Sequence, residues 1–459
     1  MQIQTRNWVF VILLPLALVA VLHNYYGTEA KMVMYLGITA FVIMVWALEV
    51  LPSVQAAILL PLLYVVLDIA PASMVFTPWL TFLPWVCVAG LVFGDILGRT
   101  GLAKRIALFC VKTMGGSFTA IVIGLMLAGI ILVFLVPAIM ARVVIFYAVT
   151  CGFADALELK KNSRMSSAIL MAGFFAATSP SLMIMTGSEV NLLGINVINA
   201  SRELINWNDY FVQNFPLGAI YCVISVVLAH FIKGKETLPS KEDVKAMVNE
   251  KLQEMGSISR DEIKTLILLV IGVTMFVLMG ANVGPWMFTI AACVAFFPGF
   301  SLINESQLRN LNFGFIFFVT GCMAIGFAAG HLGLPAKIGA MMAPILEGES
   351  GLMCIALSYG AGLGLNFLLT PLAATSSMSA PLVAVAEQLG MNPAPFIYSF
   401  LYGLEQYIFP YEYALFLFFF MEGRMTLKHI LPSLAVRMVL AFILLLGLAY
   451  PYWKMLGII

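Results

Sequence analysis

The feature that most constrains this chain is a succession of long apolar stretches, running from Trp8 to Tyr450 with short polar segments between them. A helix needs roughly 20 mostly apolar residues to cross the hydrocarbon core of a bilayer. Hydrophobic residues make up 62% of the chain and charged residues 10%, which is too apolar for a water-soluble domain to keep a wettable surface. The sequence therefore predicts an all-α polytopic membrane protein whose surface faces the lipid bilayer.

About eleven full spans are expected, each bounded by polar or turn residues. They lie near residues 8–24, 33–51, 54–70, 80–99, 165–199, 214–232, 265–280, 284–303, 312–331, 395–421 and 430–450. A cytoplasmic N-terminus puts the basic segments 99–112, 160–164 and 424–428 on the cytoplasmic side. This orientation agrees with the positive-inside rule.

Composition also excludes several classes of function. The net charge of +1 provides no electrostatic footprint for nucleic acid. The seven cysteines are scattered without a CxxC pair, and no histidine and glutamate spacing suggests a metal site. No GxSxG turn or phosphate-binding loop is present, so neither an enzyme nor a resident cofactor is expected.

One polar interruption divides the chain. In residues 234–264 lysine and glutamate alternate, and an amphipathic helix is expected near 241–254. We read this segment as a cytoplasmic linker. The expected organisation is N-terminal peripheral spans at 1–52, a first repeat at 53–233 and a second repeat at 265–459.

The two halves share a sequence pattern. Gly94, Gly98, Gly101-Leu102 and Ile106 recur 232 positions later at Gly326, Gly330, Gly333-Leu334 and Ile338, and Pro137 recurs 234 positions later at Pro371. Small residues at this spacing let helices approach closely, which explains part of the match. An odd number of spans separates the equivalent segments, so the halves are expected to be inverted repeats.

Segments 117–156 and 352–389 are apolar stretches centred on the two prolines. Each is either two full spans or a re-entrant hairpin. The first tip reads LVPAIMA and the second LTPLAATSS, and neither has the several turn residues of a loop in water. Irregular backbone at membrane depth is tolerated inside protein, so we favour hairpins. The expected tip residues are Pro137, Ala138, Thr370, Pro371, Thr375, Ser376 and Ser377.

Two spans contain polar breaks. The first break contains Thr186, Gly187, Ser188, Glu189 and Asn191, and the second contains Glu405, Pro410 and Glu412. Unwound backbone at mid-membrane exposes amide and carbonyl groups to a ligand. Each break is expected to face the hairpin tip of its own half, which gives two half-sites.

Ionisable residues within the membrane need partners or a water-filled cavity, so they are functional candidates. For Arg142 two interpretations stand side by side: it holds an anionic substrate, or it forms a structural ion pair, for instance with Glu189. Glu189 is alternatively a proton- or cation-coupling group. Glu405 and Glu412 either bind an ion or pair at a helix end.

Several motifs resemble one family. The segments GRTGLAKRIA, GHLGLPAKIG, MGSISRDEIKTL and AEQLGMNPAPF, together with the order of spans, look like the divalent anion/sodium symporter family of the ion transporter superfamily. The resemblance runs from about residue 49 to the C-terminus. It implies a homodimer in the bacterial inner membrane, with a scaffold domain and an elevator-type transport domain made of the hairpins and broken helices. It also implies sodium-driven uptake of dicarboxylates, citrate or sulfate.

The chain departs from the family at both tips. Where the family carries a Ser-Asn-Thr signature, this sequence reads Ala138-Ile139-Met140 and Leu372-Ala373-Ala374. Hard cations need oxygen ligands, which these side chains do not supply. We therefore expect a secondary transporter of small anions coupled to sodium or protons, or working by exchange. The alternatives are a cation/proton antiporter and a non-transporting membrane sensor.

Overall fold

The computed structural model describes residues 5–26, 30–47, 50–135, 139–201, 205–236, 240–346, 348–367, 369–409, 412–420 and 423–459. Within these ranges every regular element is a helix. Among the described residues, seven helices are long and apolar enough to cross a membrane, and shorter apolar helices accompany them. The predicted fold class, an all-α polytopic membrane protein, is confirmed.

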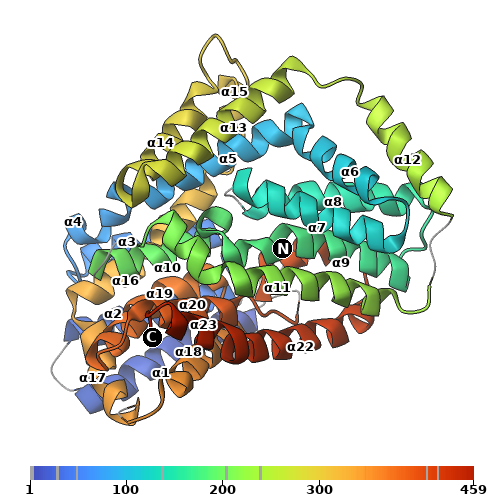
Figure 1. Ribbon diagram of the computed structural model, residues 1–459. Helices are drawn as coiled ribbons and strands as arrows, with labels where there is room; N and C mark the ends of the chain where they lie inside the picture. The colour runs from blue at the N-terminus through green and yellow to red at the C-terminus, as the bar shows by residue number, and fades with distance from the viewer. Residues whose placement is uncertain are drawn as a thin grey trace.

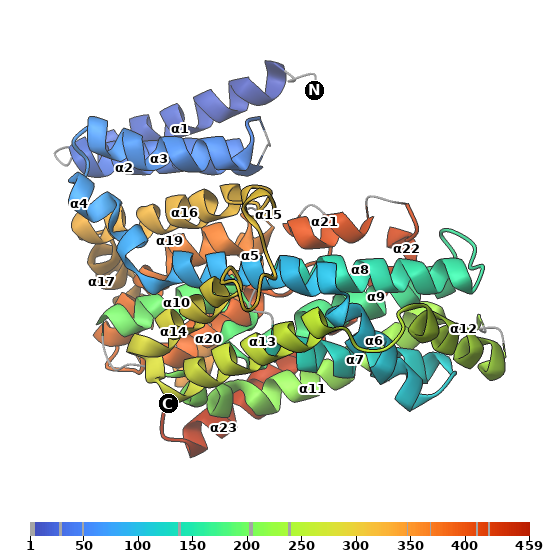
Figure 2. The same cartoon turned by 90° about the horizontal axis from the view of Figure 1, so that it is seen from above.

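The N-terminal helices form a layer of their own. They are α1 (Thr5–Tyr26), α2 (Ala30–Ala47) and α3 (Ser53–Val66). Figure 2 shows them stacked along one side of the molecule, with α3 facing α16 (Gly314–His331). The approach of α3 to α16 is close, because a Cβ on Gly321 would lie 2.4 Å from the carbonyl oxygen of Ala57. A glycine at this position lets the two helices touch through their backbones.

The elements of the first half of the chain follow, coloured from blue to green in Figure 1. They are α4 (Ala72–Val75), η1 (Thr77–Leu80), α5 (Phe82–Thr100), α6 (Leu102–Met114), α7 (Phe118–Leu135), α8 (Ile139–Ala156), α9 (Arg164–Thr178), η2 (Ser179–Met183), η3 (Met185–Gly187), α10 (Glu189–Ser201) and α11 (Trp207–Lys233).

In the second half, α16 starts 232 positions after the start of α5. The elements of this half are α13 (Arg260–Leu278), α14 (Gly280–Val294), α15 (Glu305–Arg309), α16, α17 (Leu334–Leu346), α18 (Gly351–Asn366), α19 (Pro371–Gln388), α20 (Pro393–Leu404), α21 (Ala414–Phe420), α22 (Leu427–Leu444), the π-helical η5 (Leu445–Ala449) and α23 (Tyr450–Met455).

The longer helices follow the predicted spans, and the structure adds shorter elements, among them α6 and α17. The sequence did not predict α6 and α17 as separate elements, because each has only 13 residues and follows a span directly. Each begins after a glycine with a positive φ, +81° at Gly101 and +68° at Gly333. Glycine adopts this left-handed conformation without the steric cost that a Cβ would add, so the chain turns sharply there.

The repeated glycines have a packing role that the structure makes visible. A Cβ on Gly94 would lie 2.5 Å from the Cβ of Ala141, so α5 and α8 approach closely there. At the equivalent position, a Cβ on Gly326 would lie 3.1 Å from the carbonyl oxygen of Ser376, between α16 and α19. In both halves, therefore, a small residue admits the second arm of the predicted hairpin.

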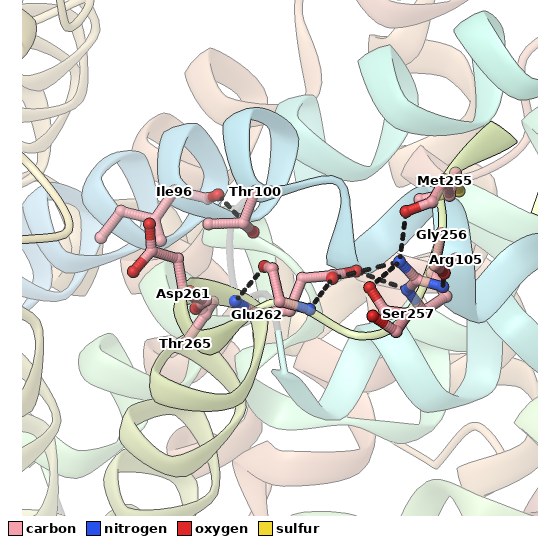
Figure 3. A network of polar contacts seen from close by, with 10 residues as sticks. Ile96, Thr100, Arg105, Met255, Gly256, Ser257, Asp261, Glu262 and Thr265 are labelled. Atoms are coloured by element: carbon pink, nitrogen blue, oxygen red, sulfur yellow. Dashed lines mark hydrogen bonds and ion pairs between the residues drawn. The ribbon is translucent and has the colours of Figure 1, made fainter.

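The linker contains the expected helix, α12 (Lys241–Glu254). Its buried face is Val244, Met247 and Val248, which packs against α6. Figure 3 shows what fixes the linker after α12. Arg105 of α6 donates to Glu262 at 2.6 and 3.2 Å and to backbone carbonyl oxygens, including that of Gly256 at 2.9 Å.

Candidate functional site

The first hairpin and the first break meet at Arg142. This side chain is fully buried on α8. Its guanidinium donates to the carbonyl oxygen of Ala177 at 3.1 Å and to Ser181 Oγ at 2.8 Å, and it also donates to the carbonyl oxygen of Gly187. Helix α8, the second arm of the predicted first hairpin, therefore contacts the first break. The guanidinium binds the oxygen atoms that the unwound chain exposes.

The break itself begins earlier than predicted. The sequence suggested residues 186–191, whereas α9 already ends at Thr178 and two short 3-10 turns follow. Thr186 and Gly187 lie in the second turn, Ser188 follows it, and Glu189 and Asn191 belong to the first turn of α10. The reason is the Ser179-Pro180-Ser181 sequence, where proline cannot continue the α-helical hydrogen-bond pattern.

Side chains on both flanks hold this break in shape. Asn191 donates to the carbonyl oxygens of Ser181 at 2.8 Å and Ile184 at 3.3 Å. Trp207 Nε1 donates to Thr186 Oγ1 at 3.3 Å, and Tyr210 donates to the carbonyl oxygen of Leu182 at 3.1 Å. Buried backbone groups are costly when they lack partners, so these bonds allow an irregular segment to lie inside the protein.

The predicted site residues of the second hairpin lie at the start of α19 and inside this helix. Thr370 is the N-cap of α19 and Pro371 its first residue, whereas Thr375, Ser376 and Ser377 lie inside the helix. Their hydroxyl groups donate to carbonyl oxygens one turn earlier; Thr375, for example, donates to Pro371 at 2.8 Å. These hydroxyls are therefore not on an open tip. Pro137 and Ala138 of the first tip lie outside the described residues.

The two glutamates of the second break, Glu405 and Glu412, have different surroundings. Glu412 is 3% exposed, and its carboxylate accepts from the backbone N–H groups of Ile408 at 3.0 Å and Phe409 at 3.1 Å. It therefore closes the turn in which it lies. Glu405, at the end of α20, is 5% exposed, and its charge interacts with those of two arginines, Arg437 and Arg142. Pro410 lies outside the described residues.

Arg437 of α22 joins the two breaks, and our sequence analysis did not single it out. It is 1% exposed, donates to Ser179 Oγ at 3.3 Å and lies 4.5 Å from the ring centroid of Tyr221 and 5.5 Å from that of Tyr407. Aromatic faces attract cations, most strongly where water is excluded. The sequence does contain the signal that would have identified it, because Arg437 is a charged residue inside the predicted span 430–450.

Amides complete the connection between the second hairpin and its break. Asn366, at the end of α18, donates to the carbonyl oxygen of Gln406 at 3.2 Å. Gln406 in turn donates to the hydroxyl of Tyr221 at 3.0 Å and to the carbonyl oxygen of Tyr402 at 3.0 Å. The end of α18, the first arm of the predicted second hairpin, thus contacts the second break.

Four buried ionisable residues lie at the two breaks, and we call them the charge network: Arg142, Glu189, Glu405 and Arg437. The charge of Glu189, which is 6% exposed, interacts with that of Arg142. Ionisable groups in the middle of a membrane need partners of this kind, because they have left water. Among the described residues, no group of histidine, cysteine, aspartate and glutamate is arranged to hold a metal ion.

A cavity lies beside this network rather than within it. Its volume is about 440 Å³, and it lies between α10, α16 and α19. Ser376 is the predicted site residue that lines it, together with polar side chains of Asn196, His331 and Glu387. The cavity reaches the second hairpin, whereas the residues of the first break are packed inside the protein.

Comparisons with known proteins agree on one family. The model of the sodium:sulfate symporter transmembrane region matches residues 4–459. The chain is 25% identical over 428 residues to an L-tartrate/succinate antiporter of Shigella boydii, covering 86% of each protein. It is also 25% identical over 323 residues to proteins of the same name from Shigella dysenteriae and Escherichia coli K12, covering 68% of this chain and 65% of each relative.

Proposed function

The chain belongs to the sodium:sulfate symporter family, and from this premise we propose that it exchanges small dicarboxylates across the bacterial inner membrane. The family and the antiporter relatives make it a secondary transporter of small anions and not an enzyme. The proposal that dicarboxylates are exchanged rests on the names of these relatives. The chain is 25% identical to them over the aligned residues.

The position of Arg142 is the observation that favours exchange rather than symport with sodium. Sodium ions in proteins require several oxygen ligands, and a break of this kind offers backbone and hydroxyl oxygens. Here three such oxygens, from Ala177, Ser181 and Gly187, accept hydrogen bonds from the guanidinium. We infer that Arg142 is a resident cation that takes the role of a sodium ion in the first half-site.

A resident cation changes how the transporter is driven. A bound sodium ion leaves with the substrate, whereas a side chain cannot leave. The anion-binding conformation is then charge-balanced without a coupling ion, so a gradient of one anion drives the movement of another.

We further propose that the hairpins and broken helices move together as an elevator. Within each half the hairpin packs on its own break, and α11 and α22 join the halves. The remaining helices make reciprocal contacts, α3 with α16 and α14 with α5. The turns at Gly101 and Gly333 lie where these two groups of helices meet. The inverted repeats, the cytoplasmic N-terminus and the homodimer belong to the same proposal.

Counterflow in proteoliposomes tests the exchange. Vesicles loaded with unlabelled succinate should take up labelled succinate or tartrate, and replacing sodium by choline should leave the rate unchanged. Empty vesicles should take up little. Arg142→Ala should lower the rate about tenfold or more, which corresponds to roughly 1.4 kcal/mol. The control Arg309→Ala removes an arginine whose pair with Glu305 is exposed.

Three results would contradict the proposal. Uptake that requires sodium in the wild-type protein would reject the resident cation, even if dicarboxylates are substrates. Uptake driven by a pH gradient without internal substrate would favour proton coupling. Tight dicarboxylate binding without any exchange would instead identify the non-transporting sensor.

A further inference from the structure

A second polar feature lies at the end of the molecule where α11 finishes. A cavity of about 270 Å³ opens there between α9, α11 and α22. Three basic side chains line it, Arg164, Lys428 and His429, and the rest of its wall includes Phe231 and Val436. We call it the basic groove. It shares no lining residue with the charge network or with the cavity beside Ser376.

Hydrogen bonds bring the two basic segments together although they are far apart in the sequence. Asn162 N–H donates to the carbonyl oxygen of Arg424 at 3.2 Å, and Ser166 Oγ donates to the same oxygen at 3.0 Å. Thr426 N–H donates to Ser167 Oγ at 3.3 Å. These bonds place the start of α22 beside the start of α9.

The groove is positively charged and open. The side chains of Arg164 and Lys428 are exposed, and neither has an acidic side chain as a partner within the described part of the chain. The neighbouring carboxylate of Glu236 accepts from the backbone N–H groups of Arg164 at 3.2 Å and Met165 at 2.7 Å, so it is occupied at the start of α9. The N-cap of α22, Thr426, makes no side-chain capping bond. The positive end of that helix adds to the potential.

Two rows of exposed apolar side chains lead away from the basic end. On α11 the row is Val223, Val227 and Phe231, which are 61%, 48% and 67% exposed and four residues apart. On α22 it is Val436, Val439 and Ile443, which are 47%, 53% and 56% exposed. Residues three or four apart lie on one face of a helix, and the two helices pack together.

We propose that the basic groove binds an anionic phospholipid. Its phosphate lies among Arg164, Lys428 and His429, and an acyl chain follows the apolar row beyond Phe231. A free anion would use only the basic end, and a zwitterionic lipid carries its own cation beside the phosphate. Basic pockets between membrane helices favour anionic headgroups, and each lysine or arginine near the surface adds to the affinity.

Native mass spectrometry of the delipidated full-length protein tests this, with phosphatidylglycerol and phosphatidylcholine added in turn. The wild-type protein should bind phosphatidylglycerol in preference. The double variant Arg164→Gln, Lys428→Gln should bind it on the order of tenfold more weakly, with phosphatidylcholine unaffected. The matched control is Lys160→Gln, Lys161→Gln, which removes two exposed charges from the neighbouring turn.

Equal phosphatidylglycerol binding by wild type and the groove variant would overturn the proposal, and so would an equal loss in the control. Displacement of the lipid by millimolar inorganic phosphate would identify a free-anion site instead. If the double variant does not fold, Lys428→Gln alone replaces it; this side chain is exposed, and its loss should weaken binding several-fold. Since binding is measured without transport, the result does not depend on the proposed exchange.

Discussion

At the scale of residues, three arginines of this protein fall into two groups: two are buried at the two breaks and one binds the linker. Arg142 and Arg437 are buried, and they bind backbone oxygens, hydroxyls and aromatic rings of the two breaks. Arg105 instead fixes the linker, outside the membrane-spanning helices (Figure 3). A buried charge without partners is strongly destabilising, so each of these arginines specifies one arrangement of its neighbours.

The partner of Arg105 gives the protein a dependence on pH. Burial alone raises the pKa of the Glu262 carboxyl, but hydrogen bonds from Arg105 and from Ser259 N–H, together with the charge of Arg105, outweigh it and leave this pKa below its ordinary value. Ionised Glu262 therefore stabilises the fold. This contribution is complete above the unfolded-state pKa of about 4.3 and is lost as the pH falls through the lower folded-state pKa.

Arg105→Gln should lower stability by about 1–3 kcal/mol at pH 7, because a charged hydrogen-bonding partner is removed. The difference from wild type should shrink as the pH falls through the lowered folded-state pKa of Glu262, because this carboxyl is then protonated in both proteins. Thermal unfolding in detergent between pH 3 and 7 measures it. A difference that stays constant over this range would contradict the role of Glu262, and the exposed Arg309→Gln serves as the control.

At the scale of elements, glycines decide how closely the helices of the second half pack. A Cβ on Gly362 of α18 would lie 2.2 Å from the carbonyl oxygen of Phe400, and one on Gly403 of α20 would lie 2.2 Å from that of Tyr359. Both clashes are with backbone, which cannot move aside as a side chain can. The contact of the second hairpin with its break depends on this crossing.

Gly362→Ala should therefore destabilise the protein by about 1–3 kcal/mol or more, the usual cost of overpacking. Gly360→Ala is the matched control, because it lies on the same helix and a Cβ there would meet nothing within 4 Å. That change should leave the unfolding temperature unchanged or slightly higher, since alanine favours helix over glycine. Equal effects of the two substitutions on thermal unfolding would contradict this crossing of α18 and α20.

At the scale of the whole molecule, the proposed elevator requires the hairpin-bearing helices to turn relative to the others. The bend at Gly101, where α5 meets α6, has a left-handed φ of +81°. A residue with a Cβ is strained there by about 1–2 kcal/mol. If the bend changes during transport, this strain favours one conformation over the other and slows turnover.

Gly101→Ala should slow dicarboxylate exchange about fivefold or more while substrate binding persists. Gly98→Ala, three residues earlier on α5, is the control, because it has no positive φ and a Cβ there meets nothing within 4 Å. Exchange rates and equilibrium binding are measured on the same preparations. Equal rates for the two variants would mean that this bend stays fixed during transport.

The sequence by itself determined the membrane class, the positions of the spans, the linker helix and the two broken segments. These follow from local properties: apolar length, the alternation of lysine and glutamate in the linker, and prolines that interrupt helices. It also marked Arg142, Glu189 and Glu405, because a charge in an apolar stretch is visible without a structure.

Only the tertiary structure decided what those residues touch. Which oxygens bind Arg142, that Glu412 closes its own turn and that Thr375 to Ser377 lie within a helix depend on the neighbours of each side chain. Arg437 joins breaks more than 200 residues apart in sequence, and the basic groove unites the starts of α9 and α22 in the same way. Sequence periodicity describes one helix at a time, whereas these contacts arise from how separate helices pack.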